Sequence, residues 1–167
     1  REHGIPVVAD LPGVGENLVD HPYVHMTFGV QPGWSLNSLL HGWRVYLQGA
    51  KWLFTRRGPL TTGASQAVAF VRSDDSVERP NLQLNFRPFS HGYDSAGRMS
   101  VDTANRVTAG ICALRPGSRG RVWLKSANPG DAPLMVGNYL ADSGDEDVLL
   151  AGVQWARNIF NAPPLQS

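Results

Sequence analysis

The sequence predicts an α+β fold, with a mainly antiparallel sheet of about five to six strands and helices packed on one face. Strand-like segments follow one another through turns rich in Asp, Ser, Gly and Pro, without strand–helix–strand alternation. Helical patterns lie before and after them. The 167 residues are 42% hydrophobic and 17% charged, which is typical of a single globular unit with a core.

The N-terminal part is predicted to contain two strands joined by a loop. A short strand-like run at residues 5–9 precedes the Pro- and Gly-rich segment 10–17, which favours a loop. Apolar and polar residues then alternate over residues 22–30, with Val24, Met26 and Phe28 against His25, Thr27 and Gly29. This period of two predicts a strand with one buried face.

Residues 36–54 carry apolar side chains at three- and four-residue steps, which predicts a helix with one apolar stripe. Either Ser35 or Asn37 is a candidate N-cap. Gly42 lowers the helix propensity, so two shorter helices are as plausible as one long helix. Residues 56–59 read Arg-Arg-Gly-Pro, which ends the helix.

Four further strands are predicted at residues 67–72, 82–86, 107–114 and 121–125. In 107–114 both faces carry apolar or small residues, so we expect both faces of that strand to be covered. Residues 90–105 show no period and are expected to form a surface loop.

The last element is a predicted helix that begins with the capping-box spacing of Ser143 and Glu146. Its apolar face is formed by Leu149, Val153, Ala156 and Phe160. The acidic residues near its start fit the positive end of the helix dipole, so they need no separate role as a carboxylate site.

Composition excludes several kinds of partner. Fifteen basic and fourteen acidic residues give a net charge of +1 without a charged run, so neither nucleic acid nor a membrane surface is an expected partner. The chain has no apolar stretch of about twenty residues, so we expect no membrane span and a soluble protein. Cys112 is the single cysteine, which excludes an internal disulfide. Arg1 at the start suggests an internal segment, and without a visible targeting signal the localisation is unknown, with the cytoplasm favoured.

Three motifs resemble a dinucleotide-binding loop, a metal site and a hydrolase nucleophile, but none has the residue spacing that such a site requires. In the Gly-rich segment 13–18, Leu18 stands where a dinucleotide fingerprint needs its third glycine. His21 and His25 would lie about 13 Å apart on a strand, too far for one metal ion. Ser118 lacks the flanking glycines of a hydrolase nucleophile and is expected to bond within its turn. We therefore predict no catalytic residue and no metal site from spacing alone.

Four stretches in register resemble the glucose-methanol-choline (GMC) family of oxidoreductases. They are Leu11–Pro22, with the sequence LPGVGENLVDHP, then Arg56–Leu60, Arg79–Gln83 and Leu114–Pro129. Pro133, Asn138–Leu140 and Asp147 continue the pattern, so the resemblance covers essentially the whole chain.

The resemblance implies an FAD-dependent oxidoreductase acting on the CH–OH group of an alcohol. It implies that residues 1–22 lie at the junction with the FAD-binding domain and that residues 23–167 belong to the substrate-binding domain. The FAD-binding motif and the catalytic histidine of the family fall outside this sequence. The expected partners are therefore a small-molecule alcohol and the remainder of the same polypeptide, and the isolated chain should bind no flavin and be inactive.

The resemblance also suggests site residues. Asn17 and His21 are candidates for contact with the cofactor, since their loop joins the domains in the family. Tyr23 and Asn85 stand where choline-oxidising relatives have an acidic residue and a histidine, so we expect a neutral primary alcohol rather than choline. Phe86 and Phe89, with His91 nearby, are further candidates for the substrate pocket.

Two other functions remain open. A stand-alone β-rich binding module could hold a ligand in the loop 90–105 without any chemistry. A relative of the same family could instead carry out lyase chemistry on cyanohydrins, as some members do. The electron acceptor, and therefore the distinction between oxidase and dehydrogenase, is not predicted.

Overall fold

The computed structural model describes residues 2–165 and has an α+β architecture, which confirms the predicted class. The described strands are β1 (Glu16–Leu18), β2 (Tyr23–Gly29), β3 (Ala67–Val71), β4 (Leu82–Arg87), β5 (His91–Tyr93), β6 (Met99–Val101), β7 (Arg106–Ala113), β8 (Gly120–Trp123) and β9 (Leu134–Val136). The helices are α1 (Asn37–Leu40), α2 (Arg44–Thr55) and α3 (Ser143–Phe160), with short 3-10 turns at Pro59–Thr61 and Pro163–Leu165.

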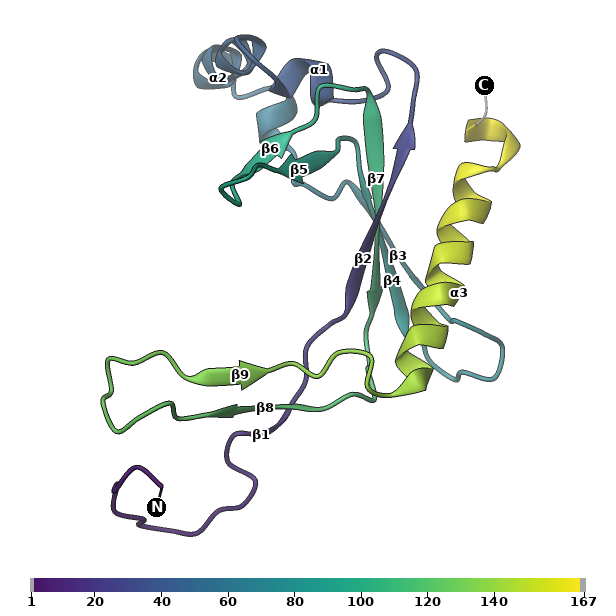
Figure 1. Cartoon of the computed structure of the whole chain (residues 1–167). Helices are drawn as coiled ribbons and strands as arrows, with labels where there is room; N and C mark the ends of the chain where they lie inside the picture. Colours follow the sequence, from purple (N-terminus) through teal and green to yellow (C-terminus); the bar gives the residue numbers. More distant parts are fainter. Residues whose placement is uncertain (1, 166–167) are drawn as a thin grey trace.

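The central sheet has four strands in the order β2-β7-β4-β3, and every neighbouring pair is antiparallel. One face packs under α3 (Figure 1). The side chains that form the core there are Leu82, Leu84, Ala109, Ile111 and Ala113 from the sheet, with Leu149 and Ala156 from the helix. The alternation predicted for residues 22–30 is confirmed, since Val24, Met26 and Phe28 pack against this core. As expected, β7 is buried from Val107 to Ala113.

The N-cap of α3 is Asp142, one residue before the predicted capping box. Its side chain accepts a hydrogen bond from the backbone N–H of Gly144 at 2.9 Å. The acid three residues after this cap is Asp145, which is buried and turned towards another segment. The predicted apolar face is confirmed, because Leu149 and Ala156 are buried and Val153 and Phe160 pack beside them.

The predicted helical stripe is divided into α1 and α2 at Gly42, whose φ of 60° lies in the left-handed region that glycine tolerates best. The predicted N-cap was wrong. Leu36 is the N-cap of α1 and makes no side-chain capping bond. The Ser35 hydroxyl still accepts from the backbone N–H of Asn37 at 3.1 Å, one residue before the cap position, while the Asn37 side chain bonds to Ser90. Helix α2 contacts α1 and the turn at Pro59–Thr61, and most of its apolar side chains are exposed, so α3 supplies the main helical packing on the sheet.

Two local predictions were wrong. Residues 5–9 form no strand, because no other strand of the protein pairs with them. Residues 90–105 are not a plain loop, since β5 and β6 form an antiparallel hairpin there. The turn of this hairpin is closed by Asp94, which accepts from the backbone N–H groups of Ala96 and Arg98, both at 2.9 Å. Three-residue strands are too short to show a period, which is why the sequence missed them.

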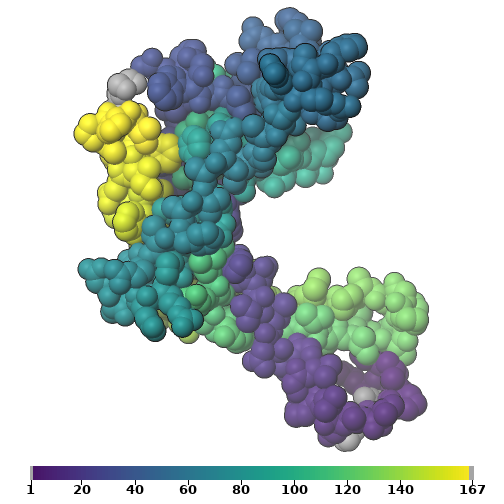
Figure 2. All heavy atoms as spheres, turned by 180° about the vertical axis from the view of Figure 1, so that it is seen from behind, coloured from purple at the N-terminus to yellow at the C-terminus, as the bar shows by residue number. Residues whose placement is uncertain are grey.

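A second sheet, β1-β8-β9, forms an arm that projects from one end of the central sheet (Figure 1). Gly15 allows the strands to approach closely, because a Cβ there would lie 2.2 Å from the carbonyl oxygen of Val122. The arm on one side, and α2 with the β5–β6 hairpin on the other, border a wide hollow in the molecule (Figure 2).

Close packing of α3 on the sheet predicts opposite outcomes for two helical glycines. A Cβ on Gly152 would lie 2.4 Å from Cγ2 of Ile111, whereas Gly49 in α2 has nothing within 4 Å. We expect Gly152→Ala to lower the free energy of unfolding by about 1–2 kcal/mol, and Gly49→Ala to raise it by about 0.5 kcal/mol. Urea denaturation of the complete protein compares the two. Equal effects would contradict the close approach of α3.

Candidate functional site

The face of the central sheet that points away from α3 is polar along β2, β7 and β4, whereas the edge strand β3 adds the exposed apolar side chains of Val68 and Phe70. In the strand register, His25 lies beside Gly110 and Gly110 lies beside Asn85. We define the polar face as Tyr23, His25, Asn85 and Arg87, together with Thr108, Gly110 and Cys112 of the central strand β7. Because side chains alternate along each strand, this face is a direct consequence of the same pattern that builds the core. It borders the hollow seen in Figure 2.

Tyr23, Asn85 and Arg87 form one hydrogen-bonded group on the polar face. The side-chain amide of Asn85, which is buried, donates to the Tyr23 hydroxyl at 2.9 Å. Nη2 of Arg87 donates to the same oxygen at 3.4 Å. The hydroxyl therefore accepts twice, and its own proton remains available for an acceptor outside the sheet.

Gly110 makes room for the Tyr23 ring. A Cβ at this position would lie 1.8 Å from the Tyr23 hydroxyl oxygen and 2.5 Å from Cζ, so a larger residue would force the phenol off the sheet. Gly110 was not among the predicted site residues. The signal was available, because a glycine in the middle of a central strand often marks the close approach of another group.

His25 is held in one tautomer by Arg87. Nη1 of Arg87 lies 3.3 Å from Nε2 of His25. Since a guanidinium cannot accept a hydrogen bond, Nε2 must be the acceptor and the ring proton must lie on Nδ1. Partial burial, followed by the charges of Arg87 and His91, lowers the pKa of His25, which also favours the neutral ring.

The β5–β6 hairpin brings aromatic rings over one end of the polar face. The His91 ring lies 5.8 Å from that of His25, 5.9 Å from that of Tyr93 and 6.3 Å from that of Phe89. Phe89 is tied to the central strand, since its carbonyl oxygen accepts from the Thr108 hydroxyl at 2.9 Å. The hairpin is thus part of the wall around the hollow.

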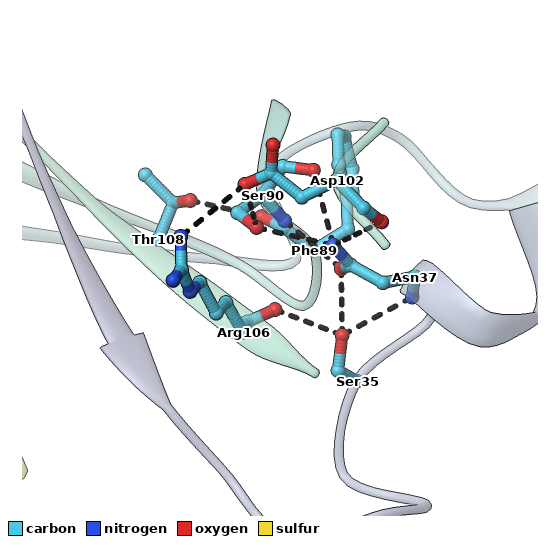
Figure 3. A network of polar contacts seen from close by, with 7 residues as sticks. All are labelled: Ser35, Asn37, Phe89, Ser90, Asp102, Arg106 and Thr108. Carbon is cyan, nitrogen blue, oxygen red and sulfur yellow. Dashed lines mark hydrogen bonds and ion pairs between the residues drawn. The ribbon is translucent and has the colours of Figure 1, made fainter. Parts of the chain in front are cut away.

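Asn37 anchors this hairpin (Figure 3). Its side chain is fully buried, and its Oδ1 accepts from the backbone N–H of Ser90 at 3.0 Å. Its Nδ2 lies 3.1 Å from the Ser90 hydroxyl and 3.0 Å from the Asp102 carbonyl oxygen. A single amide therefore joins α1 to both strands of the hairpin.

The rest of this network extends to the start of β7 (Figure 3). The Ser35 hydroxyl lies 2.6 Å from Oδ1 of Asn37 and 2.8 Å from the carbonyl oxygen of Arg106. The Ser90 hydroxyl donates to the Asp102 carboxylate at 2.6 Å, and Arg106 lies 4.0 Å from the same carboxylate. The network therefore fixes where His91 lies relative to the polar face.

Of the two residues predicted to contact a cofactor, Asn17 lies in strand β1 of the arm and His21 lies on the connection from the arm to the central sheet. Asn17 is exposed at a β-bulge in β1, with a φ of 61°. Asparagine tolerates this left-handed backbone better than most residues, and a bulge redirects the side chain it carries. His21 is also exposed, and its backbone N–H donates to Asp20 at 2.8 Å.

Asp20 links that connection to the segment that follows β9. Its second carboxylate oxygen accepts a short hydrogen bond from the Tyr139 hydroxyl. This bond lowers the pKa of Asp20 and raises the pKa of Tyr139. His21 and Tyr23 lie with Tyr139 around a surface pocket at this point.

The structure does not bring all the predicted pocket residues together. Tyr23 and Asn85 are in direct contact on the polar face, whereas Phe86 lies on the opposite face, where its ring is 6.3 Å from that of Phe160 under α3. Adjacent residues of a strand must point to opposite sides of the sheet, so Asn85 and Phe86 do not share one pocket. Phe89 lies at the edge of the polar face through its contact with His91.

Residues 2–165 give little support for a reactive thiol, a serine nucleophile, a metal site or a membrane-spanning helix. Burial, and next the negative charge of Asp20, raise the pKa of the Cys112 thiol. Ser118 bonds outside its turn, because its hydroxyl accepts from the backbone N–H of Asp142 at 3.0 Å. The described part of the chain has no grouping of three His, Cys, Asp or Glu side chains suited to a metal ion. None of its helices has the length and apolar character needed to cross a membrane.

Known proteins resemble the chain over nearly all its residues. It is 38% identical to an alcohol dehydrogenase [acceptor] from Pseudomonas putida over 99% of this chain and 30% of that protein. It is 36% identical to an oxygen-dependent choline dehydrogenase from Chromohalobacter salexigens over 98% of this chain and 29% of that protein. The chain thus spans about 30% of the length of these relatives.

The fold is shared with solved structures that have lower sequence identity. A formate oxidase structure covers 99% of the chain with a TM-score of 0.84 at 23% identity, and the match spans 33% of that oxidase. A fungal aryl-alcohol oxidase covers 99% with a TM-score of 0.67 at 20% identity, spanning 34% of it. Residues 116–167 match the family model described as GMC oxidoreductase. The chain is thus similar to GMC oxidoreductases: residues 116–167 match the family model, and the relatives match nearly all of the chain.

Proposed function

We propose that this chain supplies the substrate-side wall of an FAD-dependent oxidoreductase that acts on the CH–OH group of an alcohol. The observation that carries the proposal is the polar face, where Tyr23, Asn85 and Arg87 form a connected set of donors beside a hollow. The alcohol dehydrogenase similar to this chain supports the same reaction class. In this proposal residues 1–22 form the junction with the FAD-binding domain and residues 23–167 belong to the substrate-binding domain.

Tyr23 is the residue proposed to meet the alcohol. Its hydroxyl accepts from Asn85 and Arg87, which polarises the O–H bond and fixes the direction of the free proton. That proton can be donated to the oxygen of the alcohol, where negative charge grows as the hydroxyl proton is removed. Asn85 and Arg87 thus act through the Tyr23 hydroxyl. We propose none of these three residues as the base that removes the hydroxyl proton of the alcohol.

The described residues could contact FAD, but they do not include a site for its pyrophosphate. The Gly-rich segment before β1 leads into a strand rather than a helix, and Gly15 is used for contact with Val122. The arrangement therefore lacks the strand–turn–helix that holds a pyrophosphate. FAD, when bound, supplies the acceptor for the hydride. The residues of this chain proposed to contact FAD are Asn17, exposed in β1, and His21, exposed on the connection to the central sheet.

Related proteins support FAD as the cofactor. A formate oxidase from Aspergillus oryzae with the same fold, at a TM-score of 0.83, was solved to examine FAD modification in that enzyme. We expect the complete protein to purify with the absorbance of an oxidised flavin. Addition of a primary alcohol under anaerobic conditions should bleach that absorbance. A complete protein that carries no flavin, or whose flavin no alcohol reduces, would contradict the proposal.

Gly110 gives a sharper test of the polar face. Because an added Cβ would displace the Tyr23 ring, Gly110→Ala should lower kcat/KM for the alcohol by about 10-fold or more, the loss of one well-placed hydrogen bond. Tyr23→Phe should show a similar loss. Gly29→Ala, at the end of β2 with nothing within 4 Å, is the matched control and should leave kcat/KM unchanged. Unchanged kcat/KM in both test variants would remove Tyr23 from the substrate site.

A further inference from the structure

We propose that Arg87 is a specificity-determining residue, which makes the polar face select alcohols that carry a carboxylate group. This inference rests on the proposed alcohol oxidation and adds the substrate class. It replaces the sequence expectation of a neutral alcohol, because the polar face carries the charge of Arg87.

Arg87 has no carboxylate partner in the part of the chain that the structure describes. The ion pairs among these residues join Arg72 to Asp75, Arg98 to Asp94 and Arg106 to Asp102. Arg87 is in none of them. An uncompensated cation on a partly buried surface attracts an anionic ligand more strongly than an exposed one would.

The present contacts of Arg87 leave much of its donor capacity unused. Its acceptors are two neutral groups, Nε2 of His25 at 3.3 Å and the Tyr23 hydroxyl at 3.4 Å. Its Nε is buried and has no hydrogen-bond partner. A guanidinium carries five N–H donors in a planar fork that matches a carboxylate, so an anion is the ligand chemistry that would complete this group.

The acids nearest to the polar face are engaged elsewhere. Asp102 accepts from the Ser90 hydroxyl within the network that anchors the hairpin. Asp20, at the other end, accepts from the Tyr139 hydroxyl and from the backbone N–H of His21. The polar face therefore presents cationic and neutral donors. The same charge disfavours a quaternary ammonium substrate such as choline.

The hydroxyl of Tyr23 and the guanidinium of Arg87 lie side by side, since one donates to the other. A substrate that reaches both would place its alcohol oxygen at Tyr23 and its carboxylate at Arg87. An aromatic spacer suits the rings of His25 and His91 at this end of the face.

Binding gives the first test, using the complete protein with benzoate as the probe in isothermal titration calorimetry. Loss of a charge-assisted contact should weaken benzoate binding by about 10- to 100-fold in Arg87→Met. Arg87→Lys should retain part of the affinity, since it keeps the charge. Arg72→Met removes an arginine that follows the edge strand β3 and is paired with Asp75, so this variant should bind benzoate as the wild type does.

Kinetics gives the second test, with 4-(hydroxymethyl)benzoate and its methyl ester as a matched pair. The wild type should prefer the acid in kcat/KM, and Arg87→Met should abolish that preference. Because Arg87 also donates to the Tyr23 hydroxyl, kcat/KM for the ester should fall as well, but by less than kcat/KM for the acid. If Arg87→Met lowered kcat/KM equally for acid and ester, Arg87 would not recognise the carboxylate of the substrate. That result would overturn the inference. Benzoate binding that is unchanged in Arg87→Met would also overturn it, whether or not any alcohol is oxidised, so this outcome is distinct from failure of the proposed function.

Discussion

Asn37→Ala is expected to lower the local free energy of unfolding by about 3 kcal/mol, since it removes a buried amide with several partners. The change leaves the buried backbone N–H of Ser90 and the partly buried carbonyl oxygen of Asp102 without their present partner. Such unsatisfied groups cost more than the hydrogen bonds themselves contribute. The hairpin that carries His91 should therefore open more often.

Amide hydrogen exchange of the complete protein measures this opening segment by segment. Exchange should increase in residues 35–40 and 90–102, while the strands under α3 keep their protection. Asn128→Ala is the control, because Asn128 bonds only within its own exposed turn and should change stability by less than about 1 kcal/mol. Unchanged protection of the hairpin in Asn37→Ala would show that the hairpin is held by other contacts.

The role of Asn37 shows what the sequence could not predict. Its position before an apolar stripe suggested a helix cap, which is a local role, but its partners lie 53 and 65 residues away. A single sequence contains no signal for such a contact. The β5–β6 hairpin was missed for a related reason, since its strands are held by pairing and by the Asp94 turn rather than by an alternating pattern.

The elements with a buried face could be predicted well. The alternation of Val24, Met26 and Phe28 predicted β2, and the apolar spacing from Leu149 to Phe160 predicted the face of α3. The same alternation places Tyr23 and His25 on the polar face. It also separates Asn85 from Phe86, a consequence that the resemblance to a family did not provide. The contact between Tyr23 and Asn85 needed the strand order, which periodicity does not give.

Asp145→Asn is expected to lower the free energy of unfolding by about 2–3 kcal/mol, because a buried carboxylate holds the start of α3 against the turn before β8. Its two oxygens accept from the backbone N–H groups of Gly117 at 2.6 Å and Ser118 at 3.0 Å. An asparagine amide has one acceptor oxygen, so its NH2 group would face one of these N–H donors. Glu146→Gln, exposed in the same helical turn, should cost less than about 1 kcal/mol.

The pH dependence of Asp145→Asn supplies an independent check. Burial alone would raise the pKa of Asp145, but the hydrogen bonds from Ser118 and Gly117 outweigh it and lower the pKa below its ordinary value of 3.8. A lowered pKa stabilises the folded state above that value, and the contribution is lost as the pH falls through the folded-state pKa. The gap in urea midpoint between wild type and variant should therefore be constant near neutral pH and narrow below about pH 4. A gap that stayed constant throughout would mean that the carboxylate charge does not hold the helix to the turn.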